Sequence, residues 1–284
     1  MIQLDPEIFL EWAGKLTRLK MYPYFDICHY LMMTIAVRED LATGANPFSR
    51  KHPFACWLSS MTMCFAGSFL ANFLMGEPVI VPFKRHDDII LATIVWYLVF
   101  YSPMDLVYRA VKFLPIKIAA SVGKEVQRVY KIHAAVLHAA KVYPSGYLVM
   151  VLIGTAKGAG SGIVKLFEQL VRGVWYPQAN EFLKPSFGTK ACVLASVVFV
   201  LEKKSIYLAG YPHEAIYFSV VAFFVYFKLS SILFNVHDPF APFENLFCAL
   251  FMGGIWDAFS RAIQASRERR VGTQEETTES KKDM

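Results

Sequence analysis

Long apolar stretches, separated by short connections that contain proline or charged residues, constrain the fold of this chain more than any other feature. The seven stretches cover residues 22–37, 53–75, 88–101, 113–140, 144–170, 187–201 and 214–234. A segment inside a lipid bilayer must satisfy its own backbone hydrogen bonds, so each stretch is expected to form an α-helix. Hydrophobic residues make up 55% of the 284 positions, which is typical of a polytopic membrane protein. The sequence therefore predicts an all-α protein with seven transmembrane helices.

The N-terminal segment differs from these stretches. Residues 5–20 are amphipathic, with Asp5 as the expected N-cap and Pro6 at the first helical position. This pattern indicates a helix that lies on the membrane surface.

The C-terminal segment also stands apart. Residues 243–264 are apolar, but a glycine pair and Asp257 interrupt them. We expect a helix on or partly in the membrane surface there, and a short eighth segment is the alternative. Residues 267–284 have no apolar periodicity and are expected to be disordered.

A short internal similarity predicts a duplication. The second stretch contains Phe65-Ala66-Gly67-Ser68, and the fifth contains Gly158-Ala159-Gly160-Ser161. A unit of three spans that is repeated directly must be inverted in the membrane, because three is an odd number. We expect five regions: an N-terminal segment in 1–20, two inverted three-helix repeats in 21–103 and 104–205, a seventh helix in 206–236, and a C-terminal segment in 237–284.

Several functions are disfavoured by composition and spacing. The net charge of +6 comes largely from the ends and connections, which suits anionic lipid, and the basic residues form no module for nucleic acid. The five cysteines have no CxxC spacing and the histidines have no ligand spacing with carboxylates, so no disulfide framework or metal site is predicted. Without a Ser-His-Asp or paired-carboxylate arrangement, an enzyme is not expected.

Three cations stand within the fourth apolar stretch. Lys124, Arg128 and Lys131 follow i, i+4 and i+7 spacing, so an α-helix places them on one face. Each charge is costly at membrane depth unless it meets a polar cavity or an anion, and a compact triad suits a phosphoinositide headgroup. The alternative is snorkelling towards a helix end, with Glu125 as a local partner. Gln127, about 100° around the helix from Arg128, is expected to take no part.

Glycines and one lysine mark the fifth stretch. Two overlapping GxxxG steps begin at Gly154, and the commonest use of this spacing is close helix packing. Alternatively, Gly67 and Gly160 mark kinks whose freed carbonyls line a wet cavity. Lys157 adjoins them, and an intramembrane lysine is a functional candidate. The pore or its gate is expected to comprise Gly67, Ser68, Lys157, Gly158, Gly160 and Ser161.

These motifs resemble a known family. Lys124-Glu125-Val126-x-Arg128-x-x-Lys131, together with Ala66-Gly67-Ser68 and Lys157-Gly158-Ala159-Gly160, looks like the trimeric intracellular cation (TRIC) channels, type B among them. The resemblance covers roughly residues 20–240. It implies a homotrimer of seven-span subunits, each with its own pore, in the endoplasmic or sarcoplasmic reticulum membrane and the nuclear envelope.

The resemblance also implies an activity. A TRIC channel conducts K⁺, and Na⁺ as well, as counter-ion flow during Ca²⁺ release, and it is opened by voltage and inhibited by luminal Ca²⁺. Its N-terminus faces the lumen and its C-terminus the cytosol. The motif match implies that Lys124 and Arg128 hold phosphatidylinositol 4,5-bisphosphate as a bound lipid, with Lys131 at the last basic position.

Two other functions remain open. Inverted repeats with broken helices are also the usual signature of secondary transporters. Transporters commonly bind substrate with a buried carboxylate, and Asp26 is the clearest acid within these spans. A lipid-binding structural protein without a pore is the third possibility.

Overall fold

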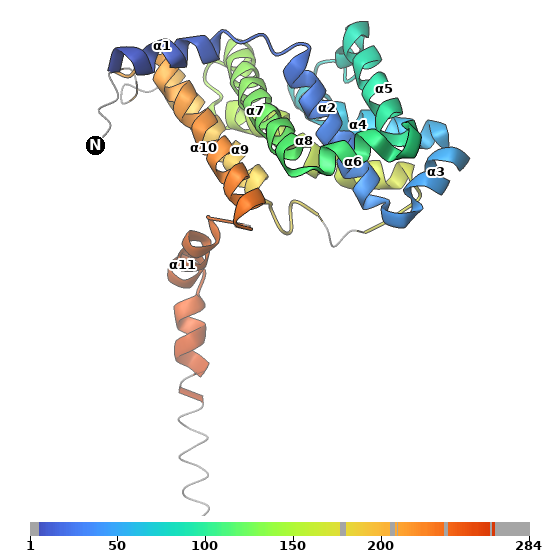
Figure 1. Cartoon of the computed structure of the whole chain (residues 1–284). Coiled ribbons are helices and arrows are strands. Elements are labelled where there is room, and N and C mark those ends of the chain that lie inside the picture. The colour runs from blue at the N-terminus through green and yellow to red at the C-terminus, as the bar shows by residue number, and fades with distance from the viewer. Residues whose placement is uncertain are drawn as a thin grey trace, which may run out of the picture. The chain divides into compact units, whose positions relative to one another are not determined.

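The computed structural model describes residues 6–176, 180–204, 208, 210–235, 238–261 and 263–264. Every regular element within these residues is a helix, which confirms the predicted all-α class (Figure 1). The chain separates into two compact units, Met1–His237 and Asp238–Met284.

A helix occupies each of the seven predicted apolar stretches. Among the described helices, three are long and apolar enough to cross a membrane, and a fourth span results if α5 is counted with its bent continuation. The count of seven crossings stays a prediction. In chain order the seven helices are α2 (Tyr24–Asp40), α4 (Pro53–Met75), α5 (His86–Tyr101), α7 (Leu114–Val142), α8 (Tyr147–Val171), α9 (Phe187–Lys204) and α10 (His213–Leu233).

Shorter helices connect the long ones. The N-terminal α1 (Pro6–Thr17) covers most of the predicted amphipathic segment, whose expected N-cap Asp5 lies outside the described residues. The other short elements are η1 (Ala42–Gly44), α3 (Ala45–Lys51), η2 (Val81–Lys84), η3 (Pro103–Asp105) and α6 (Leu106–Lys112).

Local sequence explains where α4 begins and ends. Pro53 stands in the first turn, where its missing N–H is not needed. Gly76 follows the last turn with a φ of +73°, a conformation that a Cβ atom disfavours. Its N–H donates to the Phe73 carbonyl at 3.2 Å, and the Glu77 N–H donates to the Asn72 carbonyl at 2.9 Å. These two bonds satisfy late carbonyls of the helix and end it.

A sharp bend separates α5 from the helical turns that follow it. The axis turns by 93° between His86–Tyr101 and Pro103–Lys112. Met104 and Asp105 have φ values of +53° and +57°, and two successive left-handed residues cannot continue an α-helix. The chain therefore leaves the axis of α5 before it enters α6.

Helix α7 has a central position in the first unit. It packs against α2, α8 and α10, and α4 crosses α8 closely (Figure 1). An apolar core that includes Tyr30, Phe65 and Trp96 joins α2, α4 and α5. At one end, α1 lies across α10, where the Phe9 and Phe218 rings meet edge to face at 5.1 Å.

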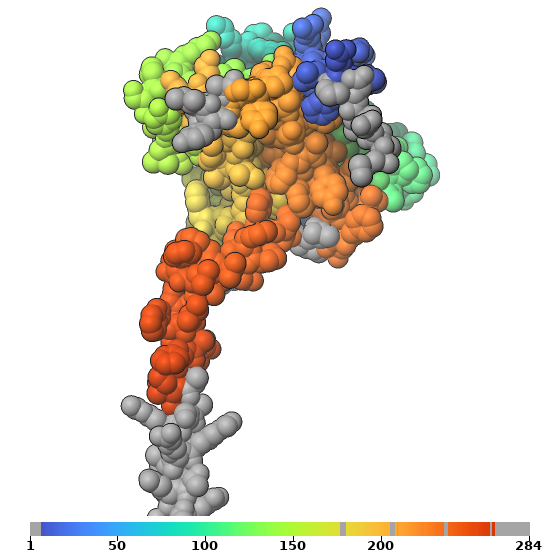
Figure 2. Space-filling view, turned by 90° about the vertical axis from the view of Figure 1, so that its left-hand side faces the viewer, coloured from blue at the N-terminus to red at the C-terminus, as the bar shows by residue number. Residues whose placement is uncertain are grey.

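Large apolar side chains remain exposed around the first unit. Phe73, Tyr97 and Leu148 are each more than half exposed. On another face, α9 and α10 lie side by side (Figure 2), and an apolar groove there is lined by residues such as Leu194 and Phe223. Apolar exposure of this extent is a liability in water and is expected for a surface that faces lipid.

The second unit contains α11 (Ala241–Phe251), and residues 254–261 are also helical. With 11 residues, α11 is too short to cross a hydrocarbon core of about 30 Å. Its exposed Phe243, Leu246 and Phe251 suit a helix on the membrane surface, which stays a prediction.

Candidate functional site

The candidate site begins where α4 crosses α8. A Cβ atom on Gly67 would overlap the backbone carbonyl of Lys157, and a Cβ atom on Gly160 would lie 2.6 Å from the Gly67 nitrogen. Only glycine at both positions allows the two backbones to come this close. Both helices are continuous across these residues, so close packing is what the structure supports, and the expected kinks stay a prediction.

Lys157 bridges the two crossing helices. Its ammonium donates a hydrogen bond to Ser68 Oγ at 3.0 Å, which links α8 to α4 one residue beyond Gly67. A lysine within an apolar helix is costly unless its charge has polar neighbours. The hydroxyl of Ser68 supplies one such neighbour at the crossing.

A narrow cavity of about 20 Å³ lies between α2, α4, α7 and α8. It brings together eight of the nine predicted site residues. The ninth, Gly160, packs against Gly67 without lining the cavity. The lining residues are His29, Met63, Cys64, Gly67, Ser68, Lys124, Gln127, Arg128, Lys131, Lys157, Gly158 and Ser161.

The lining of this cavity is strongly cationic. It carries three lysines and Arg128, and no carboxylate is among the lining residues described. Arg128 Nη1 forms an ion pair with Glu125 at 3.1 Å, as the snorkelling alternative expects for a local partner. The side chain of Arg128 is nevertheless only 16% exposed, and it lines the cavity instead of extending to solvent.

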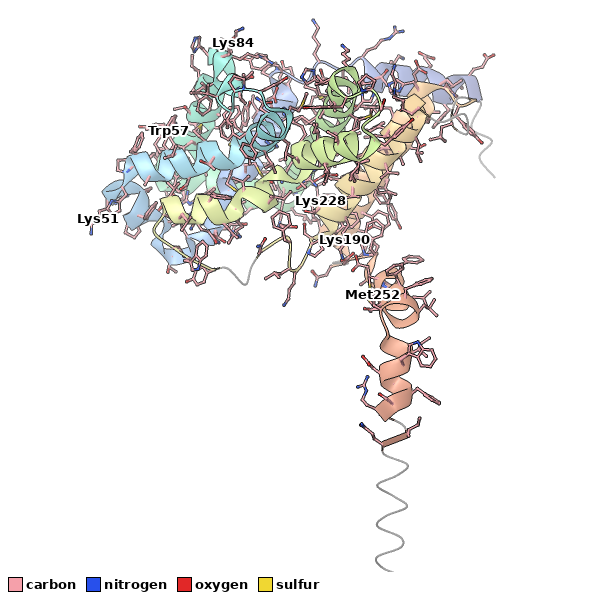
Figure 3. The ribbon with its side chains drawn as sticks, turned by 180° about the vertical axis from the view of Figure 1, so that it is seen from behind. Lys51, Trp57, Lys84, Lys190, Lys228 and Met252 are labelled. Atoms are coloured by element: carbon pink, nitrogen blue, oxygen red, sulfur yellow. The ribbon has the colours of Figure 1, made fainter. Side chains whose placement is uncertain are left out.

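Two lysines outside the fourth stretch, Lys228 and Lys157, lie close enough to the cations of α7 to interact with them electrostatically. Lys228 of α10, labelled in Figure 3, interacts electrostatically with Lys124, Arg128 and Glu125. Lys131 interacts with Lys157 across the α7–α8 contact. Sequence reasoning missed Lys228, although a lone lysine in the apolar 214–234 stretch is the signal that would have found it.

A second, wider cavity of about 790 Å³ adjoins the first. It opens between α2, η2 and α7, and its lining includes the carboxylates of Asp26 and Asp88. The residues that line both cavities are Ser68, Gln127, Lys131 and Lys157. The Lys157–Ser68 hydrogen bond therefore stands at the boundary between the cationic cavity and the wider one.

Gln127 occupies this boundary as well, although it lies outside the cationic face that the sequence predicted for α7. Its side chain is fully buried and donates a hydrogen bond to Asp26 of α2. Sequence reasoning treated α7 as a helix with one polar face, whereas α2 and α8 enclose two faces of it. That Gln127 takes no part in lipid binding stays a prediction. His29 was also missed, and its Nε2–H donates to the Cys64 carbonyl at 2.9 Å beside the cavity.

A set of ion pairs joins the end of α2 to α8, away from the cavities. Arg172 donates to Glu168 at 2.6 and 2.9 Å and also to Asp40, while Lys165 donates to Asp40 at 2.9 Å. Asp40 lies beyond the apolar stretch that ends at residue 37. Burial alone would raise the pKa of its carboxyl, but the hydrogen bonds from Lys165 and Arg172 outweigh burial and hold the pKa below its ordinary value.

Arg38 forms a related set at the same end of α2. Its guanidinium donates to the Val99 carbonyl, pairs with Asp105 at 2.9 Å and lies 4.2 Å from the centre of the Tyr108 ring. It thereby ties the end of α2 to the bend after α5.

Polar cavities between the helices of a membrane protein are typical of channels and transporters. Within that class, a family model described as "TRIC channel" matches residues 42–235. The chain belongs to the TRIC channel family, so the resemblance of its motifs is confirmed.

Curated relatives and solved structures agree. The chain is 65% identical over 269 residues to trimeric intracellular cation channel type 1B.1 of Caenorhabditis elegans, covering 95% of this chain and 91% of that protein. It is 43% identical over 193 residues to type B of Danio rerio, covering 68% and 66%. A trimeric intracellular cation channel from C. elegans solved in the absence of Ca²⁺ has a TM-score of 0.78, 56% identity and coverage of 83% and 100%.

Family membership establishes a coarse function. The protein is a multi-pass membrane protein of a cation-channel family, and members of this family are channels and not enzymes.

Proposed function

We propose that this chain is one subunit of a homotrimeric K⁺ channel with one pore per subunit and a phosphoinositide bound beside the pore. K⁺, and Na⁺ as well, flows as counter-ion during Ca²⁺ release, across the endoplasmic or sarcoplasmic reticulum membrane and the nuclear envelope. The names of the relatives support the trimer and the intracellular membrane. A related structure, 39% identical with a TM-score of 0.75 and coverage of 79% and 99%, concerns the activity of TRIC counter-ion channels in calcium release.

The charge of the narrow cavity carries the lipid part of the proposal. Four cations face one small space that has no lining carboxylate among the described residues. Arg128 pairs with Glu125, whereas the three lysines have no ion-pair partner among the described residues. Their positive charge would repel K⁺ and is costly at membrane depth. A headgroup with several phosphates, such as that of phosphatidylinositol 4,5-bisphosphate, would offset both costs, because it brings several negative charges and many acceptor oxygens.

The residues at the boundary between the two cavities support the proposal that the subunit conducts K⁺. Lys157, Ser68, Gln127 and Lys131 separate the narrow cavity from the wider one. The hydrogen bond from Lys157 to Ser68 supports a role for this positive charge on the proposed path between the two cavities. We infer that K⁺ passes when this ammonium leaves the path, and that the arrangement described above is a non-conducting one.

The crossing of α4 and α8 supports the inverted repeats. These helices are the second of each expected three-helix unit, and they meet at matched glycines, Gly67 and Gly160. Two related helices that cross at related residues are what a pseudo-two-fold axis in the membrane plane produces. With α10 outside the repeats, this arrangement gives the seven-span subunit.

Single-channel recording of the purified protein in a planar bilayer tests the function. Unitary K⁺ currents that depend on voltage would support the channel, whereas slow, saturating uptake without unitary currents would favour the transporter alternative. Absence of any flux across a range of voltages and Ca²⁺ concentrations would leave only a lipid-binding structural protein. Native mass spectrometry in detergent tests the trimer and the retained lipid in one measurement.

A further inference from the structure

A cluster of metal-ligating side chains lies where α7, α9 and α10 meet. His133 of α7, Glu202 of α9 and His213 of α10 each present one ligand atom, and these atoms lie within 4.8 Å of one another. His213 Nδ1 is 2.5 Å from Glu202 Oε1, and the His133 and His213 rings stack with centroids 4.8 Å apart. None of the three residues lines the narrow cavity or the wider one.

The surroundings hold these side chains in place without sealing them off. The rings of Phe199 and Tyr217 pack against His133 at centroid distances of 4.9 and 5.8 Å. The side chains of His213 and Glu202 are 39% and 16% exposed, so an ion can reach them from solvent. Lys203 interacts electrostatically with His133 and opposes a cation, whereas the carboxylate of Glu202 favours one.

The donor set selects a class of ion. Two imidazoles and one carboxylate suit Zn²⁺ and its neighbours in the first transition row, whereas Ca²⁺ and Mg²⁺ prefer oxygen ligands alone. Bonds of about 2.0–2.2 Å in a tetrahedral site place ligand atoms about 3.3–3.6 Å apart. Rotation of half-buried side chains can bring donors that now lie within 4.8 Å to that spacing.

We propose that His133, Glu202 and His213 form a binding site for a divalent transition-metal ion, with Zn²⁺ the best fit and solvent in the fourth position. The ion joins α7 to the last turn of α9 and the first turn of α10. Because it binds the folded arrangement and bridges three helices, it stabilises this corner of the subunit. The sequence predicts no metal site because the three residues are widely separated along the chain.

Zinc binding by the full-length protein tests the proposal. Purified protein stripped with a chelator is titrated with Zn²⁺ alone against a chromogenic competitor. We expect one ion per chain, and a loss of affinity of at least about tenfold in each of His133→Gln, Glu202→Gln and His213→Gln. The matched control is His138→Gln. His138 Nε2 also lies 2.7 Å from a carboxylate, that of Glu77, but this pair offers a metal ion two ligand atoms, whereas the proposed site offers three.

A second measurement separates a metal site from a hydrogen-bonded cluster that only supports the fold. Zn²⁺ should raise the melting temperature of the wild type and of His138→Gln, and it should leave that of Glu202→Gln unchanged. The three substitutions lie on three different helices, so the site is still tested if one variant fails to fold. Wild-type protein that takes up no Zn²⁺, or binding that is lost only in His138→Gln, would overturn the proposal.

Discussion

The protein buries cations in two regions. The cations of one region form ion pairs with carboxylates, whereas the lysines of the other form none with the described residues. At the end of α2, Arg172 and Arg38 have side chains that are 2% and 5% exposed, and each pairs with carboxylates at hydrogen-bond distance. In the narrow cavity, Lys124, Lys131 and Lys157 form no ion pair with a carboxylate of the described residues, and Lys157 has a serine hydroxyl as its partner. Buried charge that is fully paired supports structure, whereas buried charge without an ion-pair partner indicates a ligand or a moving ion.

The largest loss of stability is expected from breaking the ion pairs at the end of α2. Arg172→Ala leaves the carboxylate of Glu168, whose side chain is 1% exposed, buried without its partner. Removal of one partner of a buried ion pair costs about 3–5 kcal/mol, so the variant should unfold at a clearly lower temperature in detergent. Lys15→Ala is the control, because the Lys15–Glu11 pair is 62% exposed on both sides. Equal melting temperatures for Arg172→Ala and wild type would show that the pairs are not structural.

Lipid retention tests the cationic cavity. Lys124→Ala and Arg128→Ala should each weaken phosphoinositide binding about tenfold or more, since a hydrogen bond to a charged group is worth about 1.5–3 kcal/mol. Arg128→Lys should rescue only in part, because an ammonium lacks the two-pronged donor geometry of guanidinium. Binding is measured in nanodiscs of otherwise neutral lipid.

The control for lipid binding comes from the same helix. Gln127 is unsuitable because its buried side chain lines the cavity, whereas Lys141 is an exposed lysine near the end of α7. Lys141→Ala should bind lipid as the wild type does. If the two alanine variants also retain it fully, the cavity is not the headgroup site.

Conduction tests the charge between the cavities. Lys157→Met removes a positive charge from the proposed path, and a unit charge about 8 Å away costs a passing cation about 2 kcal/mol at an effective dielectric constant of 20. We expect severalfold more K⁺ current through the variant in single-channel recordings. Lys157→Arg keeps the charge and should conduct like the wild type, so equal gains in the two variants would mean that packing, not charge, is responsible.

The smallest expected effect is the pH dependence of stability that comes from the ion pairs of Asp40 at the end of α2. The folded pKa of Asp40 lies below its ordinary value, so its ion pairs stabilise the fold above the unfolded pKa of about 4, and this stability is lost as the pH falls through the lowered pKa. Asp40→Asn should cost about 1 kcal/mol near neutral pH, because the Asp40 side chain is 28% exposed. Thermal unfolding at neutral and acidic pH should show the difference between wild type and variant shrinking in acid. A constant difference would assign the effect to packing.

The periodicity of the sequence determined where the long helices lie and which residues share one face of a helix. Apolar stretches located the seven long helices, since the bilayer requires each segment to satisfy its own backbone. Spacing of i, i+4 and i+7 placed Lys124, Arg128 and Lys131 on one face of α7, because that geometry is local to the helix. The bounds of α4 were also predictable, as Pro53 and Gly76 act within one turn.

Only the tertiary structure decided which residues from different helices meet. It enclosed Gln127 against Asp26, set Lys157 beside Ser68, paired Arg172 with Asp40, and gathered His133, Glu202 and His213. The partners in these contacts come from different helices. A local sequence pattern does not determine which helices pack together or in which axial register they pack. That choice depends on how closely helices approach, and the backbone contact of Gly67 with Lys157 sets it for α4 and α8.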